Sequence, residues 1–578
     1  MTDPALPPVM NRAAAGVDFD SAEARARLKK RYRAEARFKA LGLLAVLVTA
    51  AFLGFLLVDI LRKGIPSFFE HRATLQITFD PAVVDPKGAR DVADLRGADY
   101  QALVRAALQA QFPEATDRRA RRALDSMISS GAVDDLRKAV LADPGIIGQT
   151  RVMPLLLSSD ADLFLRQRET LITRLKGSGP LQVQGEGSSI TLRNGGAAFR
   201  VALAETKAFL AERRRALLAE LATLPPAGGN ASVDAKRNEL EQAANAIQAR
   251  ITDANAPETL TDREPSLFVS IGGGILKITE IGPNDAKATT LVAPRPGSLI
   301  TDWSVLTLRV PETNRRVNDA VSAWLETLAQ RGMTEKAFNA RFFTNGDSRE
   351  PELAGIRGAL IGSALTLLVT LLLCVPIGVA AAIYLEEFAP KNRFTDLLEV
   401  NINNLAAVPS IVFGLLGLAV FLNAFNLPRS APLVGGLVLA LLVLPTIIIA
   451  SRAALKAVPP SIKEAALGIG ASHQQAVFHH VLPLAMPGIM TGTIIGMAHA
   501  LGETAPLLMI GMVAFIVDIP GAITEAATVL PVQIFLWSDL PELAFQSRTA
   551  GAIIVLLGFL LVMNAAAVIL RRMFERRW

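Results

Sequence analysis

Four stretches of this chain contain no charged side chain over 21 to 29 consecutive residues. They run over Gly358–Leu385, Val400–Pro428, Ala431–Ser451 and Thr549–Leu570. About 20 apolar residues suffice for a helix to cross a hydrocarbon core roughly 30 Å thick. Because an unpaired backbone group is costly in lipid, we expect each run to cross the membrane as a helix.

Two further segments complete the predicted set of spans. Leu484–Phe515 is apolar except for His499 and Glu503, and Ala40–Val58 lies near the N-terminus. About 39 mostly polar residues precede Ala40, so we expect a retained anchor rather than a cleaved signal peptide. The sequence therefore predicts an all-α polytopic membrane protein with six spanning helices.

Basic residues indicate which ends face the cytoplasm, because Lys and Arg are retained on that side. A cluster of eight lies shortly before the first span: Arg25, Arg27, Lys29, Lys30, Arg31, Arg33, Arg37 and Lys39. Four follow the last span: Arg571, Arg572, Arg576 and Arg577. We therefore expect a multi-pass protein with both termini in the cytoplasm. The net charge of +6 follows from this asymmetry and implies no nucleic-acid partner.

The segment 63–354 between the first two spans is soluble in character and is predicted to lie outside the cytoplasm. Helical periodicity marks Asp99–Leu141 and Phe199–Ile251, the second as a hairpin broken at Leu224–Ser232. Strand patterns mark Leu181–Gly196 as a β-hairpin and Ser266–Gly282 as another strand pair or a bulged strand. A helix over Asn314–Arg331 is expected to lead back to the membrane. An inserted α+β domain follows from these patterns.

Enzymatic chemistry is not indicated by the sequence. Gly272–Gly274 lacks the spacing of a nucleotide-binding loop and is expected to be a turn or bulge. We find no P-loop and no nucleophile–base constellation, so ATP hydrolysis and catalysis are not expected of this chain. The single cysteine, Cys374, is expected to be an apolar helix residue.

A polar stretch rich in small side chains, Glu464–Gly488, lies between the predicted fourth and fifth spans. Pro459 and Pro460 precede a short helical pattern, and Gly470 provides a turn that other residues resist. A second helical piece is expected to end at Pro483. Small side chains permit close approach of another protein, so we predict a docking helix; an ordinary interfacial loop is the alternative.

The order of these residues resembles the EAA loop of ABC-importer permeases. The matching positions are Glu464, Ala465, Ala466, Gly470, Leu482 and Pro483, within a predicted coupling loop at 457–483. In that family the loop docks into a cleft of a separate ATPase subunit. His480 departs from the pattern, which usually has an aliphatic residue there.

Further motifs resemble the A-type membrane subunit of phosphate-specific ABC importers. They are Ala381–Asp396, Ala406–Leu415, Ala500–Gly511 and Leu530–Phe535, and the resemblance covers 354–578. It implies a type I importer permease fold over 355–578, after a basic segment 1–39 and a first span 40–62. The implied setting is a bacterial inner membrane.

The implied partners are a second, C-type permease subunit, two ATPase subunits and a periplasmic phosphate-binding protein. ATP and Mg²⁺ belong to the ATPase subunits, so no cofactor is expected on this chain. A permease for another oxyanion, such as sulfate or molybdate, stays open. So does a membrane receptor with an outer sensor domain.

Glu503 is an ionisable residue inside a predicted span, and such residues usually face a cavity or a partner. His499 lies one helical turn earlier, so the two are expected to pair. Pro506 cannot donate to the carbonyl of Gly502, which predicts an interrupted helix at Thr504. These residues border the substrate path in one interpretation and form a structural pair in the other. Two ligands do not make a metal site.

Other pathway candidates carry weaker arguments. Ser410 follows Pro409 within a span and marks a kink near the path or a packing kink. Arg452, Arg357 and Arg548 lie at the ends of spans, and nothing in the sequence places them together. His479 and His480 are expected to form a polar helix face.

Overall fold

The computed structural model describes residues 22–185, 189–226, 231–294, 302–513 and 515–574. The expected cytoplasmic segment therefore lies partly outside the described residues, as do Arg576, Arg577 and part of the 224–232 break. Contacts divide the chain into two units, one up to Lys63 and one from Gly64 onward.

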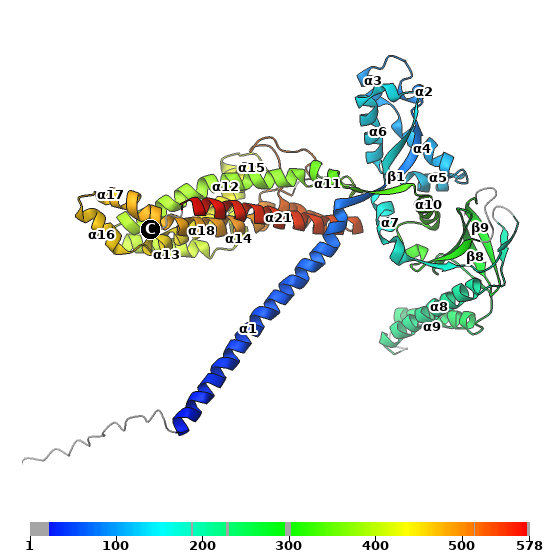
Figure 1. The fold of residues 1–578 in the computed structure, drawn as a ribbon, viewed down its shortest axis with the longest axis horizontal. Helices are drawn as coiled ribbons and strands as arrows, with labels where there is room; N and C mark the ends of the chain where they lie inside the picture. The colour runs from blue at the N-terminus through cyan, green and yellow to red at the C-terminus, as the bar shows by residue number, and fades with distance from the viewer. Residues whose placement is uncertain (1–21, 186–188, 227–230, 295–301, 514, 575–578) are drawn as a thin grey trace, which may run out of the picture. The chain divides into compact units, whose positions relative to one another are not determined.

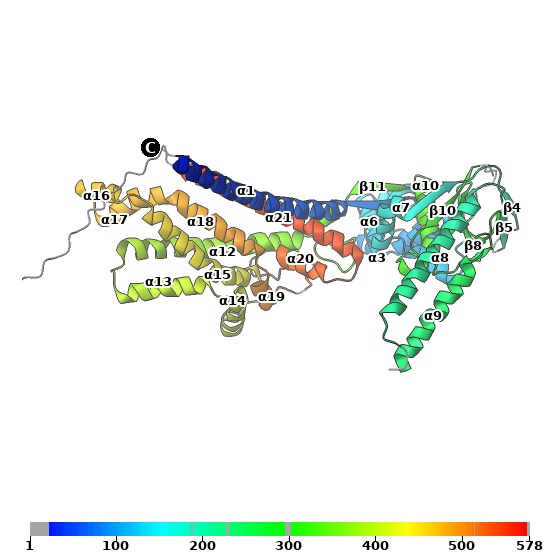
Figure 2. The same cartoon turned by 90° about the horizontal axis from the view of Figure 1, so that it is seen from below.

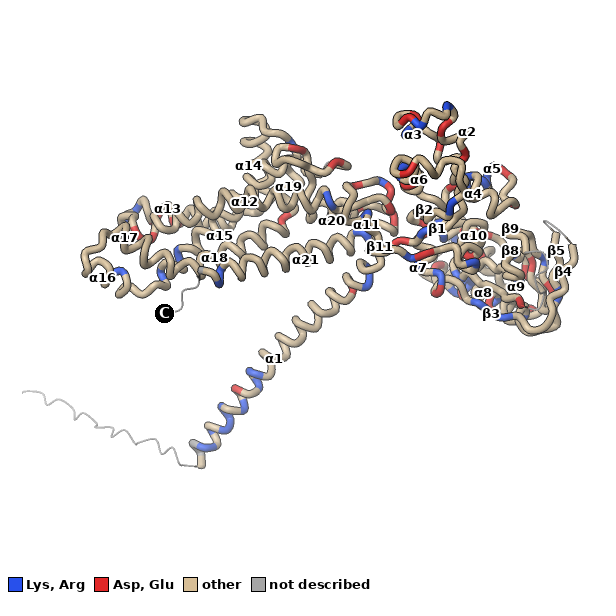
Figure 3. The backbone as a smooth tube through the Cα atoms, turned by 45° about the horizontal axis from the view of Figure 1, so that its top comes forward, with Lys and Arg blue, Asp and Glu red and all other residues tan. Residues whose placement is uncertain are grey.

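The described part of the first unit lies in one long helix, α1 (Ala22–Gly64), whose last residue belongs to the second unit. Its first turns carry the basic cluster, and the apolar segment Ala40–Val58 continues from it without a break (Figures 1 and 3). The side chains of this apolar segment are exposed in the chain by itself, for example Phe52 at 62% and Leu53 at 66%.

The second unit contains the remaining long apolar helices. α12 (Arg357–Ile383), α15 (Pro432–Lys456), α18 (Leu482–Gly502) and α21 (Leu543–Phe574) lie side by side (Figures 1 and 2). Among the described residues, five helices, counting α1, are long and apolar enough to cross a membrane, or six if one bent helix pair is a single span. The count of six stays a prediction.

That bent pair corrects the expectation of a continuous helix over Val400–Pro428. α13 (Arg393–Ala406) and α14 (Ser410–Gly417, extended by a π-turn to Ala424) meet at a bend of 99°. Pro409 lacks an amide proton and biases the preceding residue away from helical geometry, so the break falls there. The expected span Leu484–Phe515 is also shorter, because α18 ends at Gly502.

Glycines set the spacing between α15 and α18. A Cβ on Gly488, Gly492 or Gly496 would lie 2.6, 2.3 or 2.8 Å from side-chain atoms of α15. The three glycines recur every four residues, so they form one face along which the helix backbones approach closely. In lipid there is no hydrophobic effect to hold helices together, so van der Waals contact between closely packed backbones takes its place.

The outer ends of the bundle are joined by shorter elements. α19 (Ala505–Met509) and α20 (Leu530–Ser538) follow α18, and α11 (Ala340–Thr344) precedes α12. Trp537 of α20 donates from its indole Nε1 to Asp347, just before α12, over 2.9 Å.

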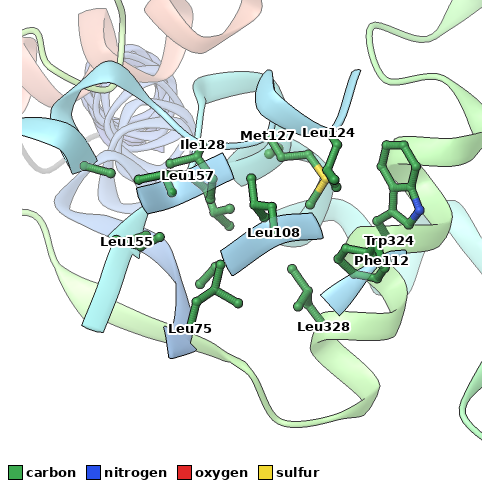
Figure 4. Packing of buried hydrophobic residues seen from close by; sticks show 14 of the residues in the cluster. Leu75, Leu108, Phe112, Leu124, Met127, Ile128, Leu155, Leu157, Trp324 and Leu328 are labelled. Carbon is green, nitrogen blue, oxygen red and sulfur yellow. The ribbon is translucent and has the colours of Figure 1, made fainter. Parts of the chain in front are cut away.

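Residues 64–344, here called the inserted domain, begin with a small antiparallel sheet of order β11-β1-β2. Its strands are β1 (Phe69–Thr78), β2 (Thr150–Leu156) and β11 (Thr334–Phe338). The helices around it are α2 (Pro81–Val84), α3 (Val92–Gly97), α4 (Tyr100–Gln111), α5 (Arg118–Asp125), α6 (Ser130–Ala142) and α7 (Ser159–Leu171). Their apolar faces meet in one core that includes Leu75, Leu108 and Phe112 (Figure 4).

A second, larger sheet has the order β3-β10-β7-β8-β9-β5-β4, with β6 paired to β8. Its strands are β3 (Ile172–Lys176), β4 (Gln182–Gln184), β5 (Ile190–Arg193), β6 (Glu258–Thr259), β7 (Ser266–Ile271), β8 (Gly274–Ile281), β9 (Asp285–Val292) and β10 (Trp303–Leu308). The predicted β-hairpin is confirmed as β4–β5, and of the two alternatives for Ser266–Gly282 the structure has the strand pair, β7–β8. Gly272 and Gly273 form the second turn at positive φ, as expected of this triplet. α8 (Ala198–Thr223) and α9 (Ala231–Ile251) form the predicted helical hairpin (Figure 2).

Helix α10 (Asp319–Gln330) contacts both halves of the inserted domain and carries two buried carboxylates. Asp319 is 2.6 Å from Nζ of Lys277 and also pairs with Arg315. Glu326 accepts from Arg168 and Arg174, each at 2.6 Å. The expected helix Asn314–Arg331 is thus a buried core helix. β11 and α11 separate it from the membrane, so it does not lead there directly.

Stability in acid tests the Asp319 pairing. Burial by itself would raise the pKa of Asp319, yet hydrogen bonds, including those from Lys277 and Arg315, hold it at about 2, below the ordinary 3.8. The folded carboxylate therefore stabilises the domain above about pH 4, and this contribution is lost as the pH falls towards about 2. We expect a loss of about 2 kcal/mol in unfolding free energy over that interval. Denaturant titrations followed by tryptophan fluorescence measure it.

The matched variant is Asp319→Asn. Its unfolding free energy is expected to be lower at neutral pH and to decline less steeply on acidification. An acid decline identical to that of the unaltered chain would contradict the assignment.

Candidate coupling elbow and membrane pathway

The docking helix predicted from sequence is α16 (Pro460–Gly468). Pro460 occupies its first turn, where a missing amide proton costs nothing. Glu464 and Ala465 are exposed, whereas Ala466 is buried and only 4% exposed. Gly470 has a φ of +91°, so the chain turns there in the left-handed conformation that glycine permits. The predicted turn at Gly470 is confirmed. We call 459–481 the elbow.

The second half of the elbow leads directly into a long apolar helix. Ser472 is the N-cap of α17 (His473–Ala476). Its hydroxyl accepts from the amide of Gln475 in a capping box. A π-turn over Val477–Val481 follows, and α18 begins at Leu482. The expectation that this piece ends at Pro483 is wrong, because Pro483 lies in the first turn of α18, where proline is tolerated. The elbow is therefore continuous with α18, without an intervening loop.

An ionic cluster holds the elbow against the neighbouring helices. Its centre is the pair Glu386 and Glu387, in the π-turn Tyr384–Phe388 that ends α12. Nζ of Lys463 on α16 lies 2.5 Å from Oε2 of Glu387. Nε2 of His473 lies 2.8 Å from the backbone oxygen of Glu387, so α17 is tied to the same turn.

Arg452 belongs to this cluster. Its guanidinium lies 2.9 Å from Glu399 on α13 and 3.4 Å from Glu386. The structure therefore places Arg452 at the elbow end of α15, between two carboxylates. Since Gly488 faces Ala454 and Gly496 faces Val443, α15 and α18 run antiparallel, and Arg452 lies at the opposite end from Glu503.

The tip of the elbow presents an apolar side chain that the sequence analysis did not single out. Ile469, between Gly468 and Gly470, is 84% exposed, and Leu467 is 40% exposed. The signal available in the sequence was an isoleucine flanked by two glycines in an otherwise polar turn.

At the other end of α18 the helix is interrupted as predicted. α18 ends at Gly502, Glu503 has an extended backbone, and Thr504 begins the short α19. Nε2 of His499 lies 3.2 Å from Oε1 of Glu503, which confirms the expected contact. The Glu503 side chain is 18% exposed and that of His499 59%.

The two broken helices meet each other. A Cβ on Gly414 of α14 would lie 2.7 Å from Cα of Pro506 and 2.9 Å from its carbonyl oxygen. A Cβ on Gly417, about one turn further along, would lie 2.3 Å from the Val438 side chain of α15. The structure thus brings the helix that begins at Ser410 into backbone contact with the helix that contains Pro506, which one sequence cannot show.

Comparison with known proteins agrees with this architecture. Residues 374–578 match the binding-protein-dependent transport system inner membrane component family, and residues 25–172 match a domain of unknown function, DUF3333. The phosphate transport system permease protein PstA of Haemophilus influenzae is 30% identical over 241 residues, which cover 42% of this chain and 83% of that protein. The chain belongs to the PstA family of ABC-transporter permeases.

Other relatives of this PstA-family permease match over similar regions. PstA 1 of Mycobacterium tuberculosis is 31% identical over 39% of this chain and 72% of that protein. The probable ABC transporter permease YqgI of Bacillus subtilis is 34% identical over 31% of this chain. The chain covers 59% of the length of YqgI, less than two thirds. The core thus has the helical fold of ABC permeases, with an additional N-terminal domain.

The remaining candidates are Arg548, Arg357, His479 and His480. Arg548 of α21 is buried and only 4% exposed. Its guanidinium carbon lies 5.5 Å from the centre of the Phe342 ring, and the guanidinium donates to the carbonyl of Glu352 over 3.4 Å. Arg357 begins α12. His479 and His480 are exposed in the π-turn of the elbow, as expected of a polar face.

Replacing Gly414 tests the crossing of α14 and α19. In Gly414→Ala the methyl group meets the backbone of Pro506, which cannot move aside as a flexible side chain would. We expect overpacking to cost roughly 1–3 kcal/mol and to lower the thermal unfolding midpoint of the purified permease. Gly558→Ala on α21 is the matched control, because a Cβ there meets nothing within 4 Å. Equal midpoints for the two variants would refute the close crossing.

Proposed function

We propose that this permease is the phosphate-translocating subunit of an ABC importer in a bacterial inner membrane. ATP hydrolysis in two partner ATPase subunits drives it, and a second, C-type permease subunit completes the pore. Both termini face the cytoplasm in this proposal, and the inserted domain faces the periplasm. The observation that carries it is an exposed elbow, clamped to the bundle, in a chain whose relatives are named phosphate transport system permeases.

The elbow is suited to receive a mechanical input. Its outer face presents Glu464, Ala465 and Ile469, while its inner face is fixed to α12 through Lys463 and His473. The same turn of α12 binds Arg452 of α15, and α17 continues into α18. A push on the elbow therefore moves three long helices together. Nucleotide binding by the partners would bias this bundle between outward and inward access.

The pathway is proposed to run past the broken helices. Backbone interrupted at membrane depth is tolerated where it lines water or is buried in protein. The breaks at Pro409 and at Glu503 lie on helices in direct contact, and Glu503 is partly exposed beside His499. Ser410, Thr504 and Pro506 belong to the same two elements. We assign this crossing to the anion path.

Selection of the anion is assigned to an external binding protein rather than to the pore. Bidentate recognition of an oxyanion favours free arginine. Arg452 is occupied by two carboxylates, and Arg548 is buried against Phe342. The pore then only has to pass the selected anion.

Uptake in a strain that lacks this chain tests the substrate. We expect loss of ATP-dependent [32P]phosphate accumulation, restored by the chain expressed in trans, with sulfate and molybdate uptake unchanged. Loss of sulfate or molybdate uptake with normal phosphate uptake would instead identify another oxyanion importer.

Reversing the charge of Glu464 tests the coupling role. Glu464 is exposed, so Glu464→Lys is expected to leave folding and membrane insertion intact while disturbing the contact with the ATPase. Phosphate uptake should fall by at least tenfold, with ATP hydrolysis retained in the purified complex. Gln474→Lys, on the exposed surface of the adjoining α17, is the matched control. Normal uptake by Glu464→Lys would remove this residue from the mechanism.

A charge swap tests the clamp. Lys463→Glu and Glu387→Lys each place like charges together, and each should lower the phosphate transported per ATP hydrolysed. The double variant restores opposite charges and should recover most of the lost coupling. The two quantities are measured together in proteoliposomes. Additive losses in the double variant would show that the two residues act independently.

A further inference from the structure

Aromatic rings form a continuous ladder between the inserted domain and the outer end of the bundle. In contact order they are Phe69, Phe338, Phe343, Phe68, Phe342, Trp537 and Phe545, with successive ring centroids 5.6–6.4 Å apart. One end is buried: Phe342 is 0% exposed, and Trp537 and Phe545 are each 1% exposed. At the other end, Phe338 is 56% and Phe343 37% exposed.

The buried end fixes the depth of the ladder along α21. A Cβ on Gly551 would lie 3.3 Å from the Phe342 ring and 2.1 Å from the hydroxyl of Ser67. Gly551 is the third residue of the uncharged run Thr549–Leu570. At 1.5 Å of rise per residue, this contact lies about 3 Å inside the end of the apolar run. With α21 spanning a bilayer, the Phe342 end of the ladder is therefore level with the boundary between hydrocarbon and headgroups, and the Phe343 ring lies 5.2 Å from it between centroids.

The exposed end is held rigidly at that level. The short helix Ile65–Phe68 contacts α21, and Asn339 accepts the amide of Phe342 over 3.1 Å. The Asn339 amide group also donates to the carbonyl of Ser67 over 3.0 Å. Because Asn339 is fully buried, the backbone on both sides of Phe338 and Phe343 is fixed.

Contact with water is unfavourable for the exposed end of the ladder. Phe338 ends β11, an edge strand, and it stacks on Phe343 at 7° between ring planes. Ile65, from the adjoining segment, is 46% exposed. Exposed apolar patches on an edge strand favour aggregation in water, whereas aromatic rings are stabilised at the headgroup level of a bilayer. Lys336, 4.7 Å above the Phe69 ring, provides a cation beside the lipid phosphates.

We propose that Phe338 and Phe343 insert into the outer-leaflet headgroup region and dock the small sheet of the inserted domain on the phospholipid surface. The occupant of the exposed patch is lipid, because the patch lies at the depth where α21 enters the bilayer. The proposal rests on the proposed function for the side of the membrane on which the inserted domain lies and also requires that α21 spans the membrane, but it stands apart from the choice of transported anion. The sheet is then held at the membrane surface.

Nitroxide scanning of the full complex in proteoliposomes tests this docking. A spin label is attached to Phe338→Cys, and separately to Phe343→Cys, in a Cys374→Ser background, since Cys374 is the only native cysteine. Collision with oxygen reports lipid exposure, and collision with a water-soluble nickel chelate reports water exposure. We expect the ratio of oxygen to nickel accessibility to be several-fold higher at both positions than at the control.

The matched control is Val152→Cys. Val152 is 63% exposed and lies on β2, the opposite edge strand of the same sheet, so its label should report water. High nickel accessibility at 338 and 343, as at 152, would overturn the proposal. Low accessibility to both reagents would also overturn it, because a protein partner would then cover the patch. Retained phosphate uptake shows that each labelled variant is folded.

Discussion

The pair of carboxylates that ends α12 is the interaction on which the elbow end of this structure depends. Glu386 and Glu387 receive the cations of α15 and α16, and the backbone of Glu387 receives His473 of α17. Partly buried charges of one sign are costly without partners. The cluster therefore sets where the elbow lies relative to the long helices. Removing a charged member leaves an opposite charge without its partner.

Close backbone packing provides the second constraint. The glycine face of α18 holds α15 near, and Gly414 lets α14 cross α19. Lipid contributes no hydrophobic drive between helices, so such contacts carry the bundle. Rigid contacts at one end of α18 and a clamp at the other make this helix a direct connection between the elbow and the broken helices.

Much of this organisation was predictable from the sequence, because the signals were local. Uncharged runs located the long helices, the Ala- and Gly-rich turn located the elbow, and Pro506 predicted the interruption beside Glu503. The break at Pro409 was recognised only as a kink, since a proline does not reveal whether its neighbours restore a straight axis. The continuation through Pro483 was missed because proline in a first helical turn does not end a helix.

Contacts between distant residues could not be predicted. Lys463 and Glu387 are 76 positions apart, and β1 pairs with β11 across most of the inserted domain. The local sequence around one partner does not identify the other. Ile469 was overlooked for a different reason: its importance comes from exposure, which follows from the turn at Gly470 and not from its residue type.

Photocrosslinking from the elbow tests the central claim most directly. A photoreactive amino acid at position 469, where the isoleucine is 84% exposed, is irradiated in native membranes and the adduct identified by mass spectrometry. The account predicts a crosslink to a subunit that binds ATP, with a yield that changes when nucleotide is added. A crosslink confined to lipid, or to a protein without nucleotide binding, would contradict it.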